Sequence, residues 1–417
     1  MKRNAVPLYS LFAANAISMV GNVLANVAIP WFVLQTTGSA TQTGITGFFT
    51  ILPVVIAGLL GGALIDRLGY KPTSIIADIA SGVTVALIPI FYFTIGLPFW
   101  LLMVLVFFGA LLDAPGSTAR GAMIPELAEM AGMPIERAAS ANQIVERSSR
   151  LIGAPLAGLL IAFLGTANVL WFDAVSFFIS AGMVAWLVAA PHIKTKMEQK
   201  GRYLQETLDG FRAIRADAVI LAIVIVVMVT NFLDAGFGGV IEPYYVKVVF
   251  GSPVSLGILI AASGAGSVVG ALIFGAVGHR MSRRVIFTAG FTLTAFRFFL
   301  FALYLPLPIL VAGFFLTSIG SGPLNPIIDS VSYERIPANM RGRIFGAIQA
   351  GAWIAMPMGV LLGGVLTEAI GLTPLLIIMG VIYLATTLSI AAIPAMKGME
   401  KKKTIDQDIN DLVTLTK

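Results

Sequence analysis

Long apolar runs alternate with short polar connectors along the whole chain. A helix that crosses a bilayer needs about 20 mostly apolar residues, because lipid offers no partner to its backbone polar groups. Glycine or proline marks a tight turn in every second connector. The pattern predicts an all-α membrane protein with twelve spans paired as helical hairpins, at approximately 7–35, 40–65, 72–95, 97–122, 138–164, 167–190, 218–246, 253–278, 284–304, 307–333, 343–369 and 373–395.

Lysine and arginine are distributed unevenly between the two sets of connectors. The six Gly/Pro turns carry almost no charge, with Lys247 the one cation near them, whereas the alternate connectors and both chain ends hold clusters of Lys and Arg. Short loops rich in Lys and Arg stay in the cytoplasm. We therefore expect a multi-pass protein of the inner (plasma) membrane, with both termini cytoplasmic and an even number of spans.

Composition narrows the class of protein further. The chain is 58% hydrophobic and only 12% charged, about half the charge of a soluble domain, which excludes a soluble enzyme. Cysteine is absent and the two histidines lie far apart, so we expect no metal and no cofactor. The net charge of +6 reflects membrane topology and predicts no nucleic-acid partner. No phosphate-binding loop is present, which excludes ATP as a direct energy source.

A shift of 213 residues aligns the two halves of the chain, which indicates an internal repeat. Segment 27–33 falls on 240–246, and the glycines at 38, 44 and 62 fall on those at 251, 257 and 275. We predict two six-helix bundles, 1–190 and 218–395, joined by a cytoplasmic linker and followed by a tail at 396–417. Within the linker, 191–217, helical spacing of four apolar residues predicts either an amphipathic helix on the inner leaflet or a plain connection: Leu204, Leu208, Phe211 and Ile214.

The connector after the second span resembles the loop signature of the major facilitator superfamily, in residues Gly62, Asp66, Arg67, Gly69 and Lys71. A degenerate copy in the second half includes His279, Arg280 and Arg284, with His279 at the acidic position. The resemblance implies the major facilitator fold, with twelve helices in two pseudo-symmetric bundles. Glycine permits the tight turn, and the charges would lock an inner gate in one state. The alternative is that these charges only set topology.

The fifth span resembles the Gly-Pro-Gly pattern of drug:proton antiporters, in residues Gly153, Pro155 and Gly158. Segments 118–126, 341–346 and 355–359 are similar to the macrolide-efflux subgroup of the same superfamily. This resemblance implies a secondary transporter that exports amphipathic drugs by proton antiport through alternating access, with the proton gradient as energy source. Packing of small residues is the alternative explanation for the glycines. Lipid or siderophore export and proton-coupled nutrient uptake remain alternative functions.

Acidic residues inside apolar spans are candidates for proton transfer, because a charge at mid-bilayer is costly and a carboxyl in an apolar cavity titrates near neutral pH. Asp113 and Asp234 are the first choices and Glu242 the third, with a structural ion pair or a helix cap as the alternative for the first two. Asp78, Asp173 and Asp329 are expected to be structural, because they lie near helix ends or on helices that are peripheral in the family. Arg120 and Arg150 are expected to pair with acidic residues of the loops.

Three amides on the first span lie seven and four positions apart, which places them on one helix face: Asn15, Asn22 and Asn26. Amides cannot be satisfied by lipid, so this face should line a central cavity or contact a neighbouring helix. Further substrate-binding candidates, with packing as the alternative for the last two, are Asn231, Tyr244, Asn325, Gln349, Trp353 and Met356. Amides combined with aromatic and Met side chains suit a bulky amphipathic ligand. The expected partners are this ligand, protons and membrane lipids, bound by a monomer.

Overall fold

The structure, a computed structural model, describes residues 4–188, 210–337 and 340–400, with side chains except those of 58–64, 66, 279, 342 and 343. These residues form helices and turns, and no strand occurs among them. Twelve helices in the described part are long and apolar enough to span a membrane, which confirms the predicted fold class. The first six are α1 (Val6–Thr37), α2 (Ala40–Leu68), α3 (Tyr70–Phe93), α4 (Phe99–Ala131), α5 (Ile135–Leu164) and α6 (Thr166–Leu187).

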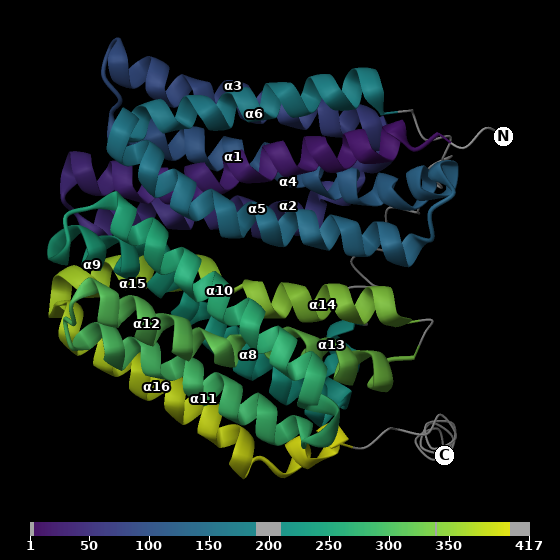
Figure 1. Cartoon of the computed structure of the whole chain (residues 1–417), viewed down its shortest axis with the longest axis vertical. Coiled ribbons are helices and arrows are strands. Elements are labelled where there is room, and N and C mark those ends of the chain that lie inside the picture. Colours follow the sequence, from purple (N-terminus) through teal and green to yellow (C-terminus); the bar gives the residue numbers. More distant parts are fainter. Residues whose placement is uncertain (1–3, 189–209, 338–339, 401–417) are drawn as a thin grey trace. The chain divides into compact units, whose positions relative to one another are not determined.

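Three of the remaining six spans consist of two helical segments each (Figure 1). A π-helical turn, Phe237–Ile241, separates α8 (Ala218–Gly236) from α9 (Glu242–Val249). Prolines lie at the breaks of two other spans, where the missing N–H removes one helical hydrogen bond: Pro323 precedes α13 (Leu324–Arg335), and Pro357 follows the first residue of α15 (Met356–Ile370). The other helices are α10 (Pro253–Val277), α11 (Arg283–Ala302), α12 (Leu307–Ser318), α14 (Arg341–Trp353) and α16 (Leu372–Ala392).

The predicted hairpin turns have the backbone conformation that their residues favour. Five of the six contain a glycine with positive φ, a region that residues with a side chain rarely adopt: Gly38, Gly96, Gly165, Gly251 and Gly371. At the sixth, the non-glycine residue Tyr304 takes the left-handed conformation with φ 50°. Gly38 and Gly251, which the 213-residue shift aligns, have nearly the same φ, 71° and 66°.

The helices group into two compact units whose limits differ from the predicted halves. The first unit comprises the described parts of 1–198, 232–264 and 356–375, and the second comprises those of 199–231, 265–355 and 376–417. The first unit therefore contains α1 to α6 together with the end of α8, α9, the start of α10, all of α15 and the start of α16. The boundaries shift because α15 packs along α2 and α10 packs on α5. The division into two six-helix bundles stays a prediction.

Two repeat-related glycines lie at equivalent helix crossings within the first unit. A Cβ at Gly44 of α2 would lie 2.9 Å from the carbonyl oxygen of Val360 on α15. A Cβ at Gly257 of α10 would lie 2.7 Å from the carbonyl oxygen of Ala154 on α5. Only glycine lets the backbones approach so closely, as in other small-residue contacts between membrane helices. The shared geometry supports the internal repeat.

Only part of the predicted linker and tail falls within the described residues. Leu204, Leu208 and the tail after residue 400 lie outside them. Residues 210–216 are helical, with Phe211 exposed and Ile214 buried against Ile220 and Ile344 of the second unit. The described end of this linker is therefore anchored by apolar packing on its own unit.

Candidate functional site

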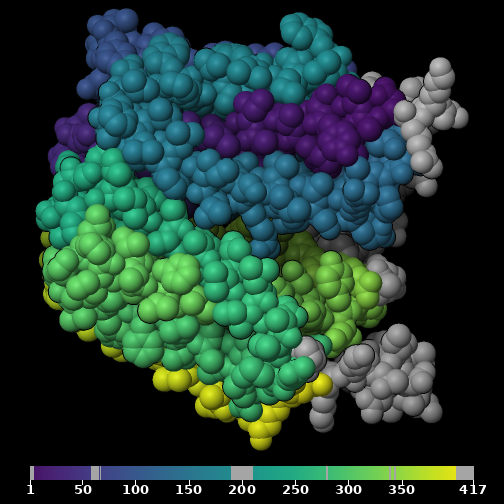
Figure 2. Space-filling view, in the orientation of Figure 1, coloured from purple at the N-terminus to yellow at the C-terminus, as the bar shows by residue number. Residues whose placement is uncertain are grey.

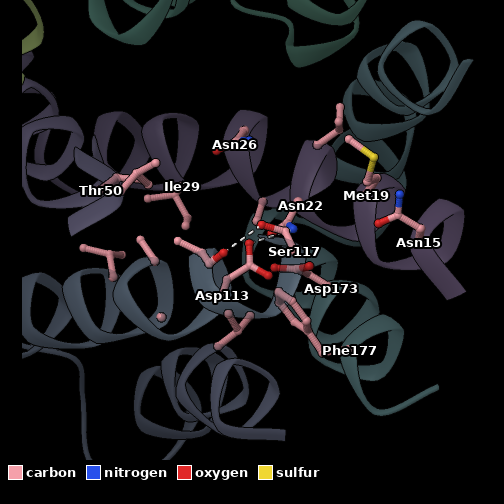
Figure 3. Close-up of a pocket in the computed structure, with 18 of the residues that line it drawn as sticks. Asn15, Met19, Asn22, Asn26, Ile29, Thr50, Asp113, Ser117, Asp173 and Phe177 are labelled. Carbon is pink, nitrogen blue, oxygen red and sulfur yellow. Dashed lines mark hydrogen bonds between the residues drawn. The ribbon is translucent and has the colours of Figure 1, made fainter. Parts of the chain in front are cut away.

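A cavity of about 580 Å³ lies within the first unit, lined by residues of α1 to α6. Its size falls within the roughly 300–1,000 Å³ of small-molecule sites. Figure 3 shows Asn22 of α1 close to Asp113 of α4, with Asp173 and Phe177 of α6 beside them. All three predicted amides, Asn15, Asn22 and Asn26, line the cavity, together with apolar side chains such as Ile29 and Val54. The structure therefore brings one predicted polar face together with one of the two acidic residues that were first choices as proton carriers.

Asp113 is held in the cavity by few polar contacts. The Asn22 amide nitrogen donates to Oδ2 of Asp113 over 3.2 Å. The other oxygen, Oδ1, lies 3.9 Å from Nη2 of Arg120, too far for a hydrogen bond, and has no hydrogen-bond partner among the described residues. The side chain is 22% exposed. Asp113 thus has one oxygen in a hydrogen bond and one oxygen without a hydrogen-bond partner.

Arg120 forms the centre of a buried polar network. Its guanidinium, 2% exposed, lies 2.5 Å from Asp78 on α3, which is fully buried. It also donates to Oδ1 of Asn15 over 3.3 Å and to the hydroxyl of Ser18 over 3.4 Å. The second oxygen of Asp78 accepts a hydrogen bond from Ser180 on α6 at 2.7 Å. Buried charges are tolerated in this way, paired and fully hydrogen-bonded.

The expectation that Arg120 pairs with loop acids is therefore wrong. Its long side chain extends from α4 between α1 and α3, where the buried Asp78 carboxylate neutralises it. Residue spacing could not predict this pair, because Arg120 and Asp78 lie 42 positions apart on different spans. The structural role expected of Asp78 agrees with this ion pair.

A chain of side-chain hydrogen bonds leads from Arg120 to α5. Asn15 accepts from Arg120 through Oδ1, and its own amide nitrogen donates to Oδ1 of Asn142 over 3.1 Å. Asn142 in turn donates to Oε1 of Glu146 over 2.8 Å. Glu146 and Arg150 also line the cavity. Helices α1, α4 and α5 are therefore joined by a polar path on the wall of the cavity.

Asp173 is the functional candidate that sequence reasoning missed. The expectation of a structural role rested on the peripheral position of its helix, but Asp173 lines the same cavity as Asp113 and is 1% exposed. Its Oδ1 has no hydrogen-bond partner among the described residues. One signal was present in the sequence: Asp173, Ser176 and Ser180 share one face of an otherwise apolar helix.

The other two acidic candidates do not line this cavity. Asp234 is half-buried near the end of α8, and Glu242 is 5% exposed at the start of α9, after the π-helical turn. Both belong to the first unit. Their assignment as proton carriers stays a prediction.

The substrate-binding candidates of the second half fall into two groups. Asn231, Asn325, Gln349 and Trp353 belong to the second unit, where Asn231 donates to the carbonyl of Ala352 over 3.0 Å and the other three are exposed. Tyr244 and Met356 belong to the first unit and pack against an apolar cluster that includes Val240 and Val360. Their roles in substrate binding stay predictions.

The loop signature and its degenerate copy make equivalent contacts in the two units. Gly69, with φ 83°, forms the turn between α2 and α3, and the ammonium of Lys71 donates to the carbonyls of Ala185 (2.9 Å) and Val188 (2.8 Å) at the end of α6. In the second unit Arg284, the repeat equivalent of Lys71, donates to the carbonyl of Ala391 at the end of α16.

These basic residues cap helix C-termini, where a cation is favourable. Arg67 and Arg280 are exposed. Gly62 lies within α2, and the side chains of Asp66 and His279 are not among the described ones. The gating role of the signature therefore stays a prediction.

The Gly-Pro-Gly pattern of α5 lies at two close contacts. A Cβ at Gly153 would lie 2.8 Å from Val23 of α1, and one at Gly158 would lie 2.6 Å from the carbonyl oxygen of Pro253 at the start of α10. Helix α5 runs uninterrupted through Pro155. The glycines therefore permit close packing of α5 on both neighbours.

Twelve spanning helices, an internal repeat and a polar cavity among the first six helices define a membrane transporter. The model of the Major Facilitator Superfamily matches residues 11–241 and 223–409, so nearly the whole described chain is covered. The chain belongs to this superfamily, whose members are transporters rather than enzymes.

Several characterised efflux proteins are similar along most of their length. The multidrug efflux pump Tap of Mycolicibacterium fortuitum is 31% identical over 378 residues, which cover 88% of this chain and 90% of the pump. Tap of Mycobacterium tuberculosis is 28% identical, with 97% of each chain covered. Macrolide efflux protein A of Streptococcus pyogenes is 21% identical, with 94% of this chain and 97% of that protein covered.

Two crystal structures share the fold at low identity. The nucleoside transporter NupG has a TM-score of 0.75 at 14% identity, with 95% of this chain and 99% of that chain covered. A D-xylose-proton symporter has a TM-score of 0.74 at 15% identity, with 95% and 99% covered. At these identities the likeness establishes the architecture alone, because one fold serves many substrates.

Proposed function

We propose that the protein exports amphipathic drug-like small molecules in exchange for protons, by alternating access. The main support for this proposal is the position of Asp113. Its carboxyl lines a cavity of small-molecule size, and one of its oxygens has no hydrogen-bond partner among the described residues. An ionisable side chain within a membrane-spanning helix is costly and therefore a functional candidate. The similarity to multidrug and macrolide efflux proteins supports drugs as the substrate class.

In this mechanism Asp113 alternates between a proton and the substrate. Ionised Asp113 accepts the hydrogen bond from Asn22 and faces the amides that line the cavity, where a ligand with apolar and polar groups finds both kinds of contact. Protonation removes the charge and turns one oxygen into a donor, so substrate contacts weaken and the carrier returns. We place the protein in the plasma membrane as a monomer with cytoplasmic termini, with Asp234 and Glu242 as further proton carriers.

Transport in everted membrane vesicles tests the proposal. Vesicles from a pump-deficient host that expresses the full chain should accumulate a radiolabelled macrolide or an amphipathic fluorescent dye when a proton gradient is imposed. A protonophore should abolish this uptake. Asp113→Asn should reduce the gradient-driven rate at least tenfold, which corresponds to about 1.4 kcal/mol or more of lost coupling.

The matched control is Glu136→Gln, which replaces an exposed carboxyl in the first turn of α5 and should transport at the wild-type rate. Uptake that persists with the protonophore would refute antiport. Full activity of both Asp113→Asn and Asp234→Asn would refute the assignment of the proton carriers. A panel of drug susceptibilities in the same host would identify the substrates.

A further inference from the structure

Two carboxyl groups of the cavity each have an oxygen without a hydrogen-bond partner among the described residues: Oδ1 of Asp113 and Oδ1 of Asp173. We propose that Asp173 is a second proton-binding group of the cavity and that it shares a proton with Asp113. This inference rests on the proposed function, in which Asp113 exchanges protons, and it adds a residue from α6 to that exchange.

Neighbouring residues of α1 bring the two carboxyls together. Asn22 donates a hydrogen bond to Asp113, and the preceding residue, Gly21, faces Asp173, because a Cβ there would lie 2.6 Å from Oδ1 of Asp173. Figure 3 shows the two carboxyl groups side by side, with Asn22 above them and Phe177 below. Both residues line the same cavity. Any side chain larger than hydrogen at position 21 would displace Asp173 from this arrangement.

Charges on the surrounding helices do not neutralise the pair. Among the polar groups that line the cavity, α1 contributes only the amides Asn15, Asn22 and Asn26. Arg120 of α4, a buried cation on the cavity wall, pairs with Asp78 of α3 at 2.5 Å and approaches Asp113 only to 3.9 Å. Glu146 and Arg150 of α5 line the cavity as one acid and one base, whose charges offset each other. Arg120 therefore offsets the charge of Asp113 only in part.

Binding of one proton would relieve the unfavourable burial of two neighbouring carboxylates. Two adjacent carboxylates repel, and a buried carboxylate without a partner costs far more than a buried carboxylic acid. A single proton converts one of the two groups to the neutral acid, which removes the repulsion between them and gives the protonated group an O–H donor. The proton can move from one carboxyl to the other without any further reactant, so Asp173 can hold the proton while Asp113 contacts substrate.

Infrared titration of the purified full chain tests the pair without any transport step. The carboxylic-acid C=O band is followed against pH for the wild type, Asp113→Asn, Asp173→Asn and the double variant, with Glu136→Gln as control. Groups that share a proton titrate as a unit, so the changes caused by the two single substitutions should not add up to the change in the double variant. Additive changes, or an Asp173→Asn titration identical to that of the wild type, would overturn the proposal.

A second measurement uses the wild-type chain and remains valid if Asp173→Asn fails to fold. A hydrophobic carbodiimide reacts with protonated carboxyls in apolar surroundings, and mass spectrometry of the digested protein then locates the modified residues. At neutral pH we expect modification of Asp173 or Asp113 and none of the exposed Glu136. If neither aspartate reacts, the proposal fails.

Replacing potassium by sodium at constant pH distinguishes a proton from a metal cation. Protection of the aspartates by sodium alone would show that the pair binds a cation other than a proton, and the same reaction in both salts supports a proton. If the pair titrates as a unit but transport ignores the proton gradient, the proposed antiport fails and the proton-sharing pair stands.

Discussion

The guanidinium of Arg120 and the carboxylate of Asp78 form an ion pair at 2.5 Å inside the first six helices, where the two side chains are 2% and 0% exposed. Both ends of the pair have further partners, with Ser180 on Asp78 and with Asn15 and Ser18 on Arg120. The pair therefore connects α3, α4, α1 and α6 around the cavity. Because Arg120 is bound to Asp78, its guanidinium lies 3.9 Å from Asp113, beyond hydrogen-bond distance.

Removal of one partner of this buried pair should destabilise the protein severely. Arg120→Gln leaves the Asp78 charge buried and uncompensated, for which the expected loss is about 3–5 kcal/mol in the free energy of unfolding. The double variant Asp78→Asn/Arg120→Gln should recover part of that loss, because no unpaired charge remains. Thermal unfolding of the detergent-solubilised protein measures both.

The pair between Arg283 and Glu334 in the second unit serves as the control, with side chains 30% and 25% exposed at 2.7 Å. Because solvent screens it, Arg283→Gln should cost only about 1 kcal/mol or less. If Arg120→Gln is as mild as Arg283→Gln, the buried pair does not stabilise the bundle.

The contact of Glu368 with the start of α2 should hold α15 against α2. Glu368 accepts from the hydroxyl of Ser39 (2.7 Å), from the backbone N–H of Thr41 (3.1 Å) and from the hydroxyl of Thr41 (2.6 Å). Since Glu368 is exposed, Glu368→Gln should weaken this contact by roughly 1 kcal/mol. The fraction of molecules in which α15 is separated from the start of α2, the open population, should then be about fivefold larger.

A single cysteine reports this opening, because the chain has no cysteine of its own. Thr43→Cys introduces a thiol at a site that is 1% exposed on α2. The rate of maleimide labelling should rise about fivefold when Glu368→Gln is added, in line with the larger open population. Adding Glu136→Gln should leave it unchanged, and equal rates in all three backgrounds would contradict the role of Glu368.

The glycine contact between α10 and α5 should not tolerate a methyl group. Gly257→Ala places a Cβ 2.7 Å from the carbonyl oxygen of Ala154, so the helices must separate or shift, at a cost of about 1–3 kcal/mol. Gly275 lies on the same helix with nothing within 4 Å of its Cβ position. Gly275→Ala should raise the thermal midpoint slightly, since alanine is the better helix former. Equal effects of the two substitutions would show that the crossing is looser than described.

The cap that Lys71 provides for α6 should depend on its charge. Lys71→Met removes two hydrogen bonds to the carbonyls of Ala185 and Val188, so the last turn of α6 should fray, while Lys71→Arg should retain most of the protection. Hydrogen–deuterium exchange of the amides in 184–188 should become several-fold faster in Lys71→Met alone. Arg284→Met should have the corresponding effect at the end of α16, and no change at either site would exclude capping as the role of these residues.

The amino-acid sequence by itself determined the class of this protein. The number of spans, the hairpin turns at Gly38 and Gly251 and the 213-residue repeat all follow from local properties, namely the length of apolar runs and the backbone freedom of glycine. Helical periodicity also placed Asn15, Asn22 and Asn26 correctly on one face, because that face depends on the spacing of residues within one helix.

Only the tertiary structure decided which charged residues meet. Periodicity gives the face of a helix but not the neighbour of that face, so it could not pair Arg120 with Asp78 across 42 positions, nor place Asp173 beside Asp113. A buried charge is stabilised by contacts from several helices at once, and those contacts exist only when the helices are packed. For the same reason the limits of the two compact units depend on glycine contacts such as that of Gly44 with α15, which no single helix reveals.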